Sequence, residues 1–366
     1  MSRERVATAR RVVVKVGSSS LTGRGARLDP ARVDRFVEEL CTLLDGRHEI
    51  VCVSSGAIAA GLAPLGLRRR PADMPTLQAA AAVGQLHLMD TYAGAFEARG
   101  GLCAQVLLTR QDFVHRGRYV NALHTFQRLL ALGVVPVVNE NDTVATDEIR
   151  FGENDLLAAL VANLVRADVL VLLSDVDGLH RRDGSLVGEV DEITDEVDRL
   201  ARGSRSSVGS GGMRSKLAAA RIATASGVPV VFARFRKGTL TRVLDGKTVG
   251  TLFAAHPSRL APRKAWIAYA TVPSGRVIVD DGARVALCEG NRSLLAAGVC
   301  GVDGSFAAGD AVDVVDASGR AFARGLVGFS SDELARIAGM GSSAIGELLG
   351  PAAAREVVHR DELVVL

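Results

Sequence analysis

The chain has 366 residues, of which 48% are hydrophobic and 23% charged, as in an ordinary globular protein large enough for two domains. Its formal net charge of +3 is too small to indicate a polyanion as the main partner. No apolar run is long enough to cross a membrane, and Lys15 interrupts the first apolar segment, which argues against a signal peptide. The five cysteines are widely spaced, which argues against a structural zinc site and fits reduced thiols in the cytoplasm; they are Cys41, Cys52, Cys103, Cys288 and Cys300.

The first two-thirds of the chain alternate short apolar runs with segments of helical period, the pattern of a parallel sheet covered by helices. Asp29 and Pro30 mark one helix start, since Asp caps helices and Pro suits the first helical position. We therefore expect an α/β fold with an open, mainly parallel sheet sandwiched by helices. The expected strands are 12–16, 50–53, 106–108, 134–138, 169–173 and 228–232, and two further expected helices are 123–130 and 156–165.

The pattern of residue types along the chain changes after about residue 250. Pro257, Pro262 and Pro273 interrupt the regular pattern, and short alternating segments with close turns follow, one of them ending in the turn 280–282. Ser330 and Glu333 have the spacing of a capping box before a short helix. We expect a catalytic domain over residues 1–262 and a small, mostly β domain over residues 263–366.

Two of the expected strands end in sequences suited to binding an anion. Lys15 lies inside an apolar strand, where an unpaired charge would be costly, and the Gly-Ser run 17–20 follows it. The run 54–57 leads from a strand into a helix, whose first N–H groups are free to bind a carboxylate or phosphate. Taken singly, each segment also fits a structural role, as an edge-strand lysine or an ordinary helix cap.

The strongest functional signal is a pair of polar clusters. Asn139-Glu140-Asn141-Asp142-Thr143 follows a strand directly, and Gly152-Glu153-Asn154-Asp155 opens a helix soon afterwards. Amide side chains bind both ends of a zwitterion, and Asp142 suits an ammonium group. Solvated turns do not need so many polar side chains, so we interpret these clusters as a binding site with a short hairpin between them.

A Gly/Ser stretch over residues 203–212 precedes Met213, Arg214, Ser215 and Lys216 at a helix start. It could deliver a lysine to a phosphate, although the Walker pattern G-x-x-x-x-G-K-[ST] is absent. The absence of G-x-G-x-x-G after the first strand argues against a dinucleotide oxidoreductase. The absence of G-x-S-x-G argues against an α/β-hydrolase.

Together these segments resemble the amino acid kinase family, and the tail resembles a PUA domain. Because six motifs occur in the family's order across nearly the whole chain, the resemblance is specific. Two positions depart from the family pattern while keeping its chemistry: Glu153 stands for Asp and Ser174 for Thr. The motifs are VVVKVGSSSLT from Val12, VSSGAIAAG from Val53, VVPVVNENDTVAT from Val134, FGENDLLAAL from Phe151, LLSDVDGL from Leu172 and GSGGMRSKLAAA from Gly209, with GVDGSFAAGDAVDVVD from Gly301 and GFSSDELARIAG from Gly328 in the tail.

The resemblance implies a kinase that uses ATP and Mg²⁺ to phosphorylate the γ-carboxylate of L-glutamate, the first step of proline biosynthesis. It implies catalytic roles for Lys15, Lys216 and Asp155, with Asp155 orienting the two lysines. No protein ligand for Mg²⁺ is implied. The implied glutamate-binding residues are Ser55, Asp142 and Asn154, and the implied nucleotide-binding residues are Lys15, Ser174, Asp175, Ser210, Gly211, Gly212, Met213, Arg214, Ser215 and Lys216.

The family also implies a cytoplasmic homo-oligomer, feedback inhibition by L-proline, and transfer of the labile acyl phosphate to glutamyl phosphate reductase. Two alternatives remain at this point: another kinase of the family, acting on aspartate, acetylglutamate, carbamate or UMP, and an RNA-binding protein of the PUA type. Residues 263–366 contain 10 Lys and Arg against 13 Asp and Glu, a net charge of −3 that suits a phosphate backbone poorly. We therefore expect no nucleic-acid partner and no membrane association.

Overall fold

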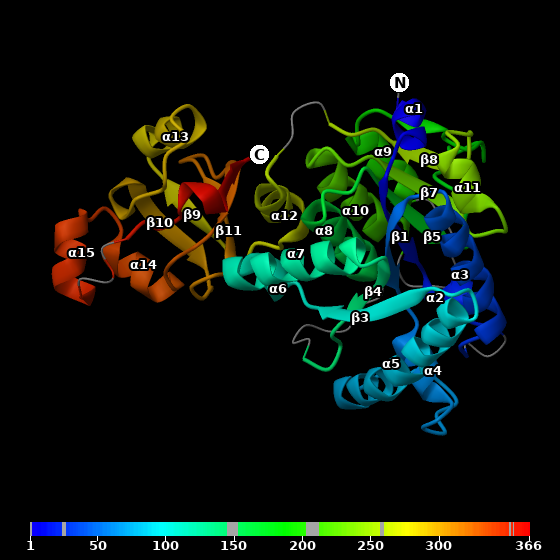
Figure 1. The fold of residues 1–366 in the computed structure, drawn as a ribbon. Coiled ribbons are helices and arrows are strands. Elements are labelled where there is room, and N and C mark those ends of the chain that lie inside the picture. Colours follow the sequence, from blue (N-terminus) through cyan, green and yellow to red (C-terminus); the bar gives the residue numbers. More distant parts are fainter. Residues whose placement is uncertain are drawn as a thin grey trace. The chain divides into compact units, whose positions relative to one another are not determined.

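The computed structural model describes residues 2–23, 27–144, 153–202, 212–256, 260–350, 353 and 355–366. The chain divides into two compact units, Met1–Arg259 and Leu260–Leu366, coloured blue to yellow and gold to red in Figure 1. Among the described residues, no helix is both long and apolar enough to span a membrane.

The first unit is built on an eight-stranded sheet with the order β3-β4-β2-β1-β5-β7-β8-β6 (Figure 1). Neighbouring strands are parallel, except that β7 and β8 are antiparallel. The predicted open, mainly parallel sheet is therefore confirmed, and so are its six predicted strands. The strands are β1 (Arg11–Val16), β2 (Glu49–Ser54), β3 (Leu102–Leu108), β4 (Val134–Glu140), β5 (Val169–Ser174), β6 (Glu189–Val190), β7 (Val230–Arg234) and β8 (Thr251–Phe253).

Helices cover both faces of this sheet. Asp29 caps α3 by accepting a hydrogen bond from the Ala31 N–H, and Pro30 is the first helical residue, as predicted. The alternate residues Val12, Val14 and Val16 of β1 belong to one buried cluster with side chains of α3 and α5. The helices of the unit are α1 (Ser2–Ala7), α2 (Ser18–Leu21), α3 (Pro30–Asp45), α4 (Ala57–Leu62), α5 (Met74–Glu97), α6 (Gln111–Val114), α7 (Arg116–Ala131), α8 (Glu153–Leu164), α9 (Asp195–Arg202), α10 (Met213–Ala225) and α11 (Thr239–Leu244).

The alternation along β1 also fixes where its lysine lies. Successive strand residues point to opposite faces of a sheet, so Lys15 leaves the sheet on the face opposite Val14 and Val16. Helices α8 and α10 pack together on β1, β5 and β7 at that face. The strand therefore directs a charged side chain toward the first turns of these two helices.

The second unit contains a five-stranded sheet with the order β10-β9-β11-β12-β13, in which only the β9–β11 pair is parallel. The capping box of Ser330 and Glu333 is confirmed at the start of α14. The elements are α12 (Pro262–Ala270), β9 (Gly275–Val279), α13 (Asp281–Cys288), the 3₁₀ turns Ala296–Gly298 and Arg360–Glu362, β10 (Val299–Gly304), β11 (Ala311–Val315), β12 (Ala321–Leu326), α14 (Ser331–Ile337), α15 (Ser342–Leu349) and β13 (Leu363–Val365).

Two local predictions in this region are wrong. Asp280 does not end its strand in a close turn, because its side chain caps α13 by accepting from the Ala283 N–H. Pro262 does not interrupt the chain, because it occupies the first turn of α12, where a missing N–H costs nothing. Both residue types are typical of turns and of helix starts, and the residues that follow them decide between the two.

Candidate active site

The carboxyl ends of β1, β2, β4 and β5 lie along one edge of the sheet, because these strands are mutually parallel. In open α/β sheets this edge is the usual place for a ligand. Most of the predicted site residues that the structure describes lie at this edge or on helices that begin beside it. Ser210, Gly211 and Gly152 lie outside the described residues, as do residues 145–151 of the hairpin predicted between the two polar clusters.

Three buried charges form the centre of the site. One carboxylate oxygen of Asp155 lies 2.6 Å from Nζ of Lys15, and the other lies 2.9 Å from Nζ of Lys216. Asp155 is 0% exposed and each lysine is 5% exposed. The sheet supplies Lys15, and the first turns of α8 and α10 supply Asp155 and Lys216. The structure thus brings together residues 61 and 140 positions apart in the sequence.

The electrostatics of this cluster favour an incoming anion. Burial by itself raises the pKa of Asp155, but the attraction of the two lysines outweighs it and leaves this pKa below its ordinary value. Burial lowers the pKa of Lys15; the charge of Asp155 only partly offsets this effect, and Lys216 adds repulsion. With both lysines protonated, the three groups carry a net positive charge in a site with little water. A phosphoryl group would neutralise that charge.

The segment at the start of α10 provides the remaining contacts to Asp155. The Ser215 hydroxyl lies within hydrogen-bonding distance of a carboxylate oxygen of Asp155, at 3.0 Å, and of the Gly212 carbonyl. Gly212 is the N-cap residue of this helix. Met213 is buried and Arg214 is exposed, so these two neighbours face different surroundings.

A second polar group lies beside the charged cluster. Nδ2 of Asn154 donates to Oγ of Ser55 and to Oδ1 of Asn139, both at 3.0 Å. Two of the predicted substrate-binding residues, Ser55 and Asn154, are therefore in direct contact. Asp142 lies in the turn after β4 and interacts electrostatically with Arg70, whose pKa is lowered by burial and raised in part by Asp142. The sequence analysis missed Arg70.

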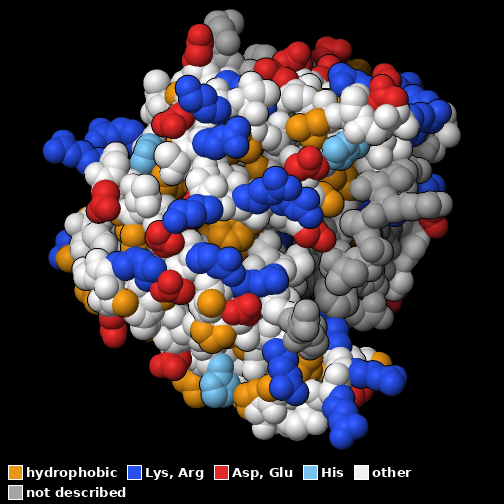
Figure 2. Space-filling view, turned by 90° about the vertical axis from the view of Figure 1, so that its right-hand side faces the viewer, with side chains coloured by type: hydrophobic (Ala, Val, Ile, Leu, Met, Phe, Trp, Pro, Cys, Tyr) orange, Lys and Arg blue, Asp and Glu red, His pale blue; other side chains and the backbone are white. Residues whose placement is uncertain are grey.

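A cavity of about 360 Å³ lies next to Ser174 and Asp175, with Ser19 and Ser20 also in its lining. Arg234, which pairs with Ser174 in the β5–β7 register, is one of its cations. The sequence analysis missed Arg234, although the basic run ARFRK that begins at the end of this strand was a visible signal. Figure 2 shows many Lys and Arg side chains on the face that carries α3 and α11. The basic residues lining the cavity are Arg32, Arg35, Arg234, Arg236 and Lys237, against the acidic Glu38, Glu39 and Asp175.

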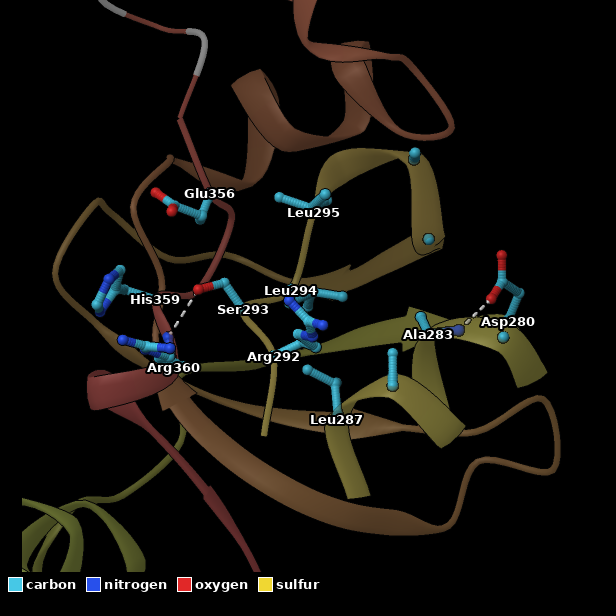
Figure 3. A pocket seen from close by; sticks show the side chains of 14 residues that line it. Asp280, Ala283, Leu287, Arg292, Ser293, Leu294, Leu295, Glu356, His359 and Arg360 are labelled. Atoms are coloured by element: carbon cyan, nitrogen blue, oxygen red, sulfur yellow. Dashed lines mark hydrogen bonds between the residues drawn. The ribbon is translucent and has the colours of Figure 1, made fainter. Parts of the chain in front are cut away.

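The second unit has a separate, larger hollow of about 770 Å³ (Figure 3). Apolar side chains such as Leu287 and Leu295 line part of it, and Arg292, His359 and Arg360 line another part. It contains none of the predicted site residues. Among the described residues of the whole chain, no group of three or more His, Cys, Asp or Glu side chains could hold a metal ion.

Comparison with known proteins gives two family matches and many relatives. The model of the amino acid kinase family matches residues 10–234, and that of the PUA domain matches residues 275–348. The chain is 51% identical to a glutamate 5-kinase from Streptomyces coelicolor, over 100% of this chain and 99% of the relative. It is 52% identical to a glutamate 5-kinase from Salinispora arenicola, over 100% of both. A glutamate 5-kinase from Myxococcus xanthus is 50% identical, over 100% of this chain and 98% of the relative.

Solved structures show a similar fold over about two-thirds of the chain at low sequence identity. A carbamate kinase from Giardia lamblia bound to AMP-PNP is 18% identical, with a TM-score of 0.51, over 68% of this chain and 100% of that one. An N-acetylglutamate synthase from Neisseria gonorrhoeae is 17% identical, with a TM-score of 0.50, over 70% of this chain and 64% of that one. At this level of identity the likeness concerns the fold alone.

Proposed function

The chain belongs to the amino acid kinase family, and from this premise we propose that it transfers the γ-phosphoryl group of ATP to the side-chain carboxylate of L-glutamate. The product is L-glutamyl 5-phosphate, and the reaction is the first step of proline biosynthesis. Glutamate 5-kinases that are about half identical over the full length support this substrate and this reaction. The observation that carries the chemistry is the buried cluster of Lys15, Asp155 and Lys216 beside Ser55 and Asn154.

The reaction does not require a general base. A γ-carboxylate is already ionised at neutral pH and is itself the nucleophile. In phosphoryl transfer, catalysis consists mainly of aligning the reactants and stabilising the charge on the equatorial oxygens. Lys15 and Lys216 supply that positive charge. Asp155 holds both ammonium groups at its two oxygens and thereby orients them, in a site from which water is largely excluded.

Ser55, Asn154 and Asp142 recognise the amino acid in this proposal. The Ser55 hydroxyl accepts from Asn154 and keeps its own hydrogen for a substrate carboxylate. The carbonyl oxygen of Asn154 and the carboxylate of Asp142 suit the ammonium group. This division of roles explains why the recognition groups are one hydroxyl, one amide and one acid, while the charged lysines face the phosphoryl group.

The nucleotide lies, in this proposal, along Ser174 and Asp175 and at the start of α10, over residues 210–216. The basic cavity lined by Arg234 and Arg236 suits its polyanionic part. Mg²⁺ would be held by phosphate oxygens and water, as it usually is beside a phosphorylated substrate, and Asp155 is already engaged by two lysines. The ion would supply neutralisation of the charge on the nucleotide phosphates.

Several finer proposals accompany this function. We assign catalysis to residues 1–262 and a regulatory or assembly role to residues 263–366. The acyl phosphate is labile in water, which supports direct transfer to glutamyl phosphate reductase. We also propose feedback inhibition by L-proline, assembly into a homo-oligomer and a cytoplasmic location, which the likeness to glutamate 5-kinases supports.

An acceptor panel tests the proposed function. ADP release by the purified full-length protein is measured with ATP and Mg²⁺ and, in turn, glutamate, aspartate, acetylglutamate, carbamate and UMP. We expect ADP release to depend on glutamate, with kcat/KM at least about 100-fold above that for any other acceptor, since a site built to hydrogen-bond its substrate rejects analogues strongly. A clear preference for another acceptor would replace glutamate in the proposal.

A further inference from the structure

Three amide side chains from different elements form a continuous hydrogen-bonded chain at the substrate side of the site. Nδ2 of Asn139, at the end of β4, donates to Oε1 of Gln85 in α5 at 2.8 Å. Oδ1 of Asn139 accepts from Nδ2 of Asn154 in α8 at 3.0 Å. We call Gln85, Asn139 and Asn154 the amide chain. Asn139 is only 2% exposed, so water does not compete for these bonds.

One backbone group fixes the direction of every hydrogen bond in the amide chain. The backbone N–H of Glu140 donates to the side chain of Asn139 at 2.9 Å, and a backbone N–H can only donate a hydrogen bond, never accept one. The atom of Asn139 that accepts must therefore be its oxygen, and the other end of this amide must be its NH₂ group. That NH₂ group requires an oxygen from Gln85, and the oxygen of Asn139 requires the NH₂ group of Asn154. The amide orientations follow from connectivity.

The oxygen at the Asn154 end of the amide chain is placed to accept a hydrogen bond from the substrate. Because Asn154 donates through Nδ2 to both Asn139 and Ser55, its buried Oδ1 has no hydrogen-bond partner among the described residues. An unpaired buried carbonyl oxygen is a ready acceptor for an ammonium group. Nε2 at the other end, on Gln85, likewise lacks a partner within the described parts of the chain. Among the described contacts of Gln85, its oxygen is therefore the side-chain atom that is engaged.

We propose that Gln85 is a positioning residue for the amino acid substrate, acting through Asn139 on Asn154. By accepting from Asn139, its oxygen holds the buried Asn139 amide in place. Asn139 in turn keeps the Asn154 oxygen and the Ser55 hydroxyl hydrogen directed to the ammonium and carboxylate of a zwitterion. This inference rests on the proposed function, in which Ser55 and Asn154 bind glutamate. It predicts that Gln85 affects amino acid binding and leaves nucleotide binding alone.

Gln85→Met tests the proposal, because Met has a similar length and no acceptor oxygen. We expect the KM for glutamate to rise about 10-fold or more, while kcat and the KM for ATP change by less than about 3-fold. An unchanged KM for glutamate in the folded variant would overturn the proposal. So would an equal rise in both KM values, which indicates a purely structural role. Thermal unfolding of each variant checks the fold.

Gln85→Glu is the conservative variant. Whether ionised or protonated, the carboxyl side chain introduced at position 85 offers an oxygen to Nδ2 of Asn139. We therefore expect the KM of this variant for the substrate glutamate to stay within about 3-fold of the wild-type value. A KM raised as far as in Gln85→Met would contradict the acceptor role, and this variant keeps the test decisive if Gln85→Met does not fold. Gln127→Met, on the exposed side of α7, is the matched control. If the wild-type chain does not phosphorylate glutamate, the proposed function fails; if it does and Gln85→Met behaves like wild type, only this inference fails.

Discussion

At the scale of single residues, the cost of burying charge explains which side chains form the centre of the site. A lone buried ion would lose several kcal/mol of hydration, so Lys15 requires an anion, and Asp155 supplies it. A second lysine on the same carboxylate then leaves one positive charge unbalanced. An arrangement of this kind is poor for stability and well suited to binding a phosphoryl group.

The phosphoryl-binding role proposed for Lys216 predicts the effect of removing its charge. In Lys216→Ala we expect kcat to fall about 100- to 1000-fold, as when one transition-state donor is removed from other enzymes, with a smaller change in the KM for glutamate. Steady-state kinetics with both substrates measure this. Lys247→Ala, at an exposed position, is the control and should behave like wild type. A variant at position 216 with kcat near the wild-type value would remove the assignment.

The pKa of Lys15 predicts an alkaline limit of activity. Burial lowers this pKa below its ordinary value of 10.5, so the ammonium group loses its proton at a lower pH than a lysine in water. In the proposed role the charged form of Lys15 binds phosphate, so kcat/KM for ATP should decline as pH rises, with the midpoint below 10.5. A pH profile of kcat/KM measures the midpoint. Constant kcat/KM up to pH 10.5 would show that Lys15 does not have this role.

Asp142 tests the division between amino acid and nucleotide sites. In Asp142→Ala we expect the KM for glutamate to rise about 10- to 100-fold, the loss of a charged hydrogen bond, with the KM for ATP nearly unchanged. Initial rates with each substrate varied in turn provide the two constants. Equal damage to both would instead indicate that the turn after β4 has collapsed.

Residue identity alone predicted part of this site. Lys15 was identifiable because a lysine is conspicuous within an apolar strand, and Asp142 and Asn154 because polar residues cluster around them. Gln85 was not, because a single Gln in an Ala-rich helix has no local signal of burial. Its partner Asn139 is 54 residues away, so only the folded chain reveals the contact.

At the scale of elements, the apolar runs in the sequence predicted most strands of the sheet, and capping residues predicted helix starts. Asp29 with Pro30 and Ser330 with Glu333 determine helix starts locally, through capping contacts within a few residues, and both were predicted. The helix α5 was not predicted. Its Ala-rich sequence has little amphipathic pattern, and its position depends on close packing against α4.

Two glycines allow that packing, and their replacement tests it. A Cβ atom added at Gly84 would lie 1.8 Å from the Ala57 carbonyl oxygen, and one added at Gly61 would lie 1.9 Å from that of Ala80. Gly84→Ala should therefore lower the free energy of unfolding by about 2 kcal/mol or more, as overpacking does in other cores. Gly94→Ala on the same helix meets nothing within 4 Å and should stabilise by about 1 kcal/mol. Denaturant unfolding measures both; equal stabilities would contradict the close contact.

At the scale of the whole molecule, the division of the chain into two units separates the proposed chemistry from the tail. Every predicted catalytic residue lies in Met1–Arg259. The sequence analysis placed a boundary after residue 262 from a change in pattern, and each unit of the structure has its own hydrophobic core. The hollow in the second unit was not predicted, since its lining comes from α13 and from residues 292–298 and 356–360, which are far apart in the sequence.

A truncated chain of residues 1–259 tests this separation. We expect it to fold and to keep kcat within about 10-fold of the full-length value, because Lys15, Asp155 and Lys216 all lie in the first unit. Loss of all activity in a soluble, folded truncation would contradict the assignment of catalysis to the first unit. The full-length chain should show no salt-dependent RNA binding, because residues 263–366 carry a net charge of −3.

Trapping the product tests the central claim most directly. The full-length protein is incubated with ATP, Mg²⁺, glutamate and hydroxylamine, which converts an acyl phosphate into a stable hydroxamate, and mass spectrometry locates the modified carboxyl group. We predict γ-glutamyl hydroxamate in amounts that match the ADP released, and none without ATP. ADP release without any hydroxamate, or a hydroxamate on the α-carboxyl group, would contradict phosphorylation of the glutamate side chain.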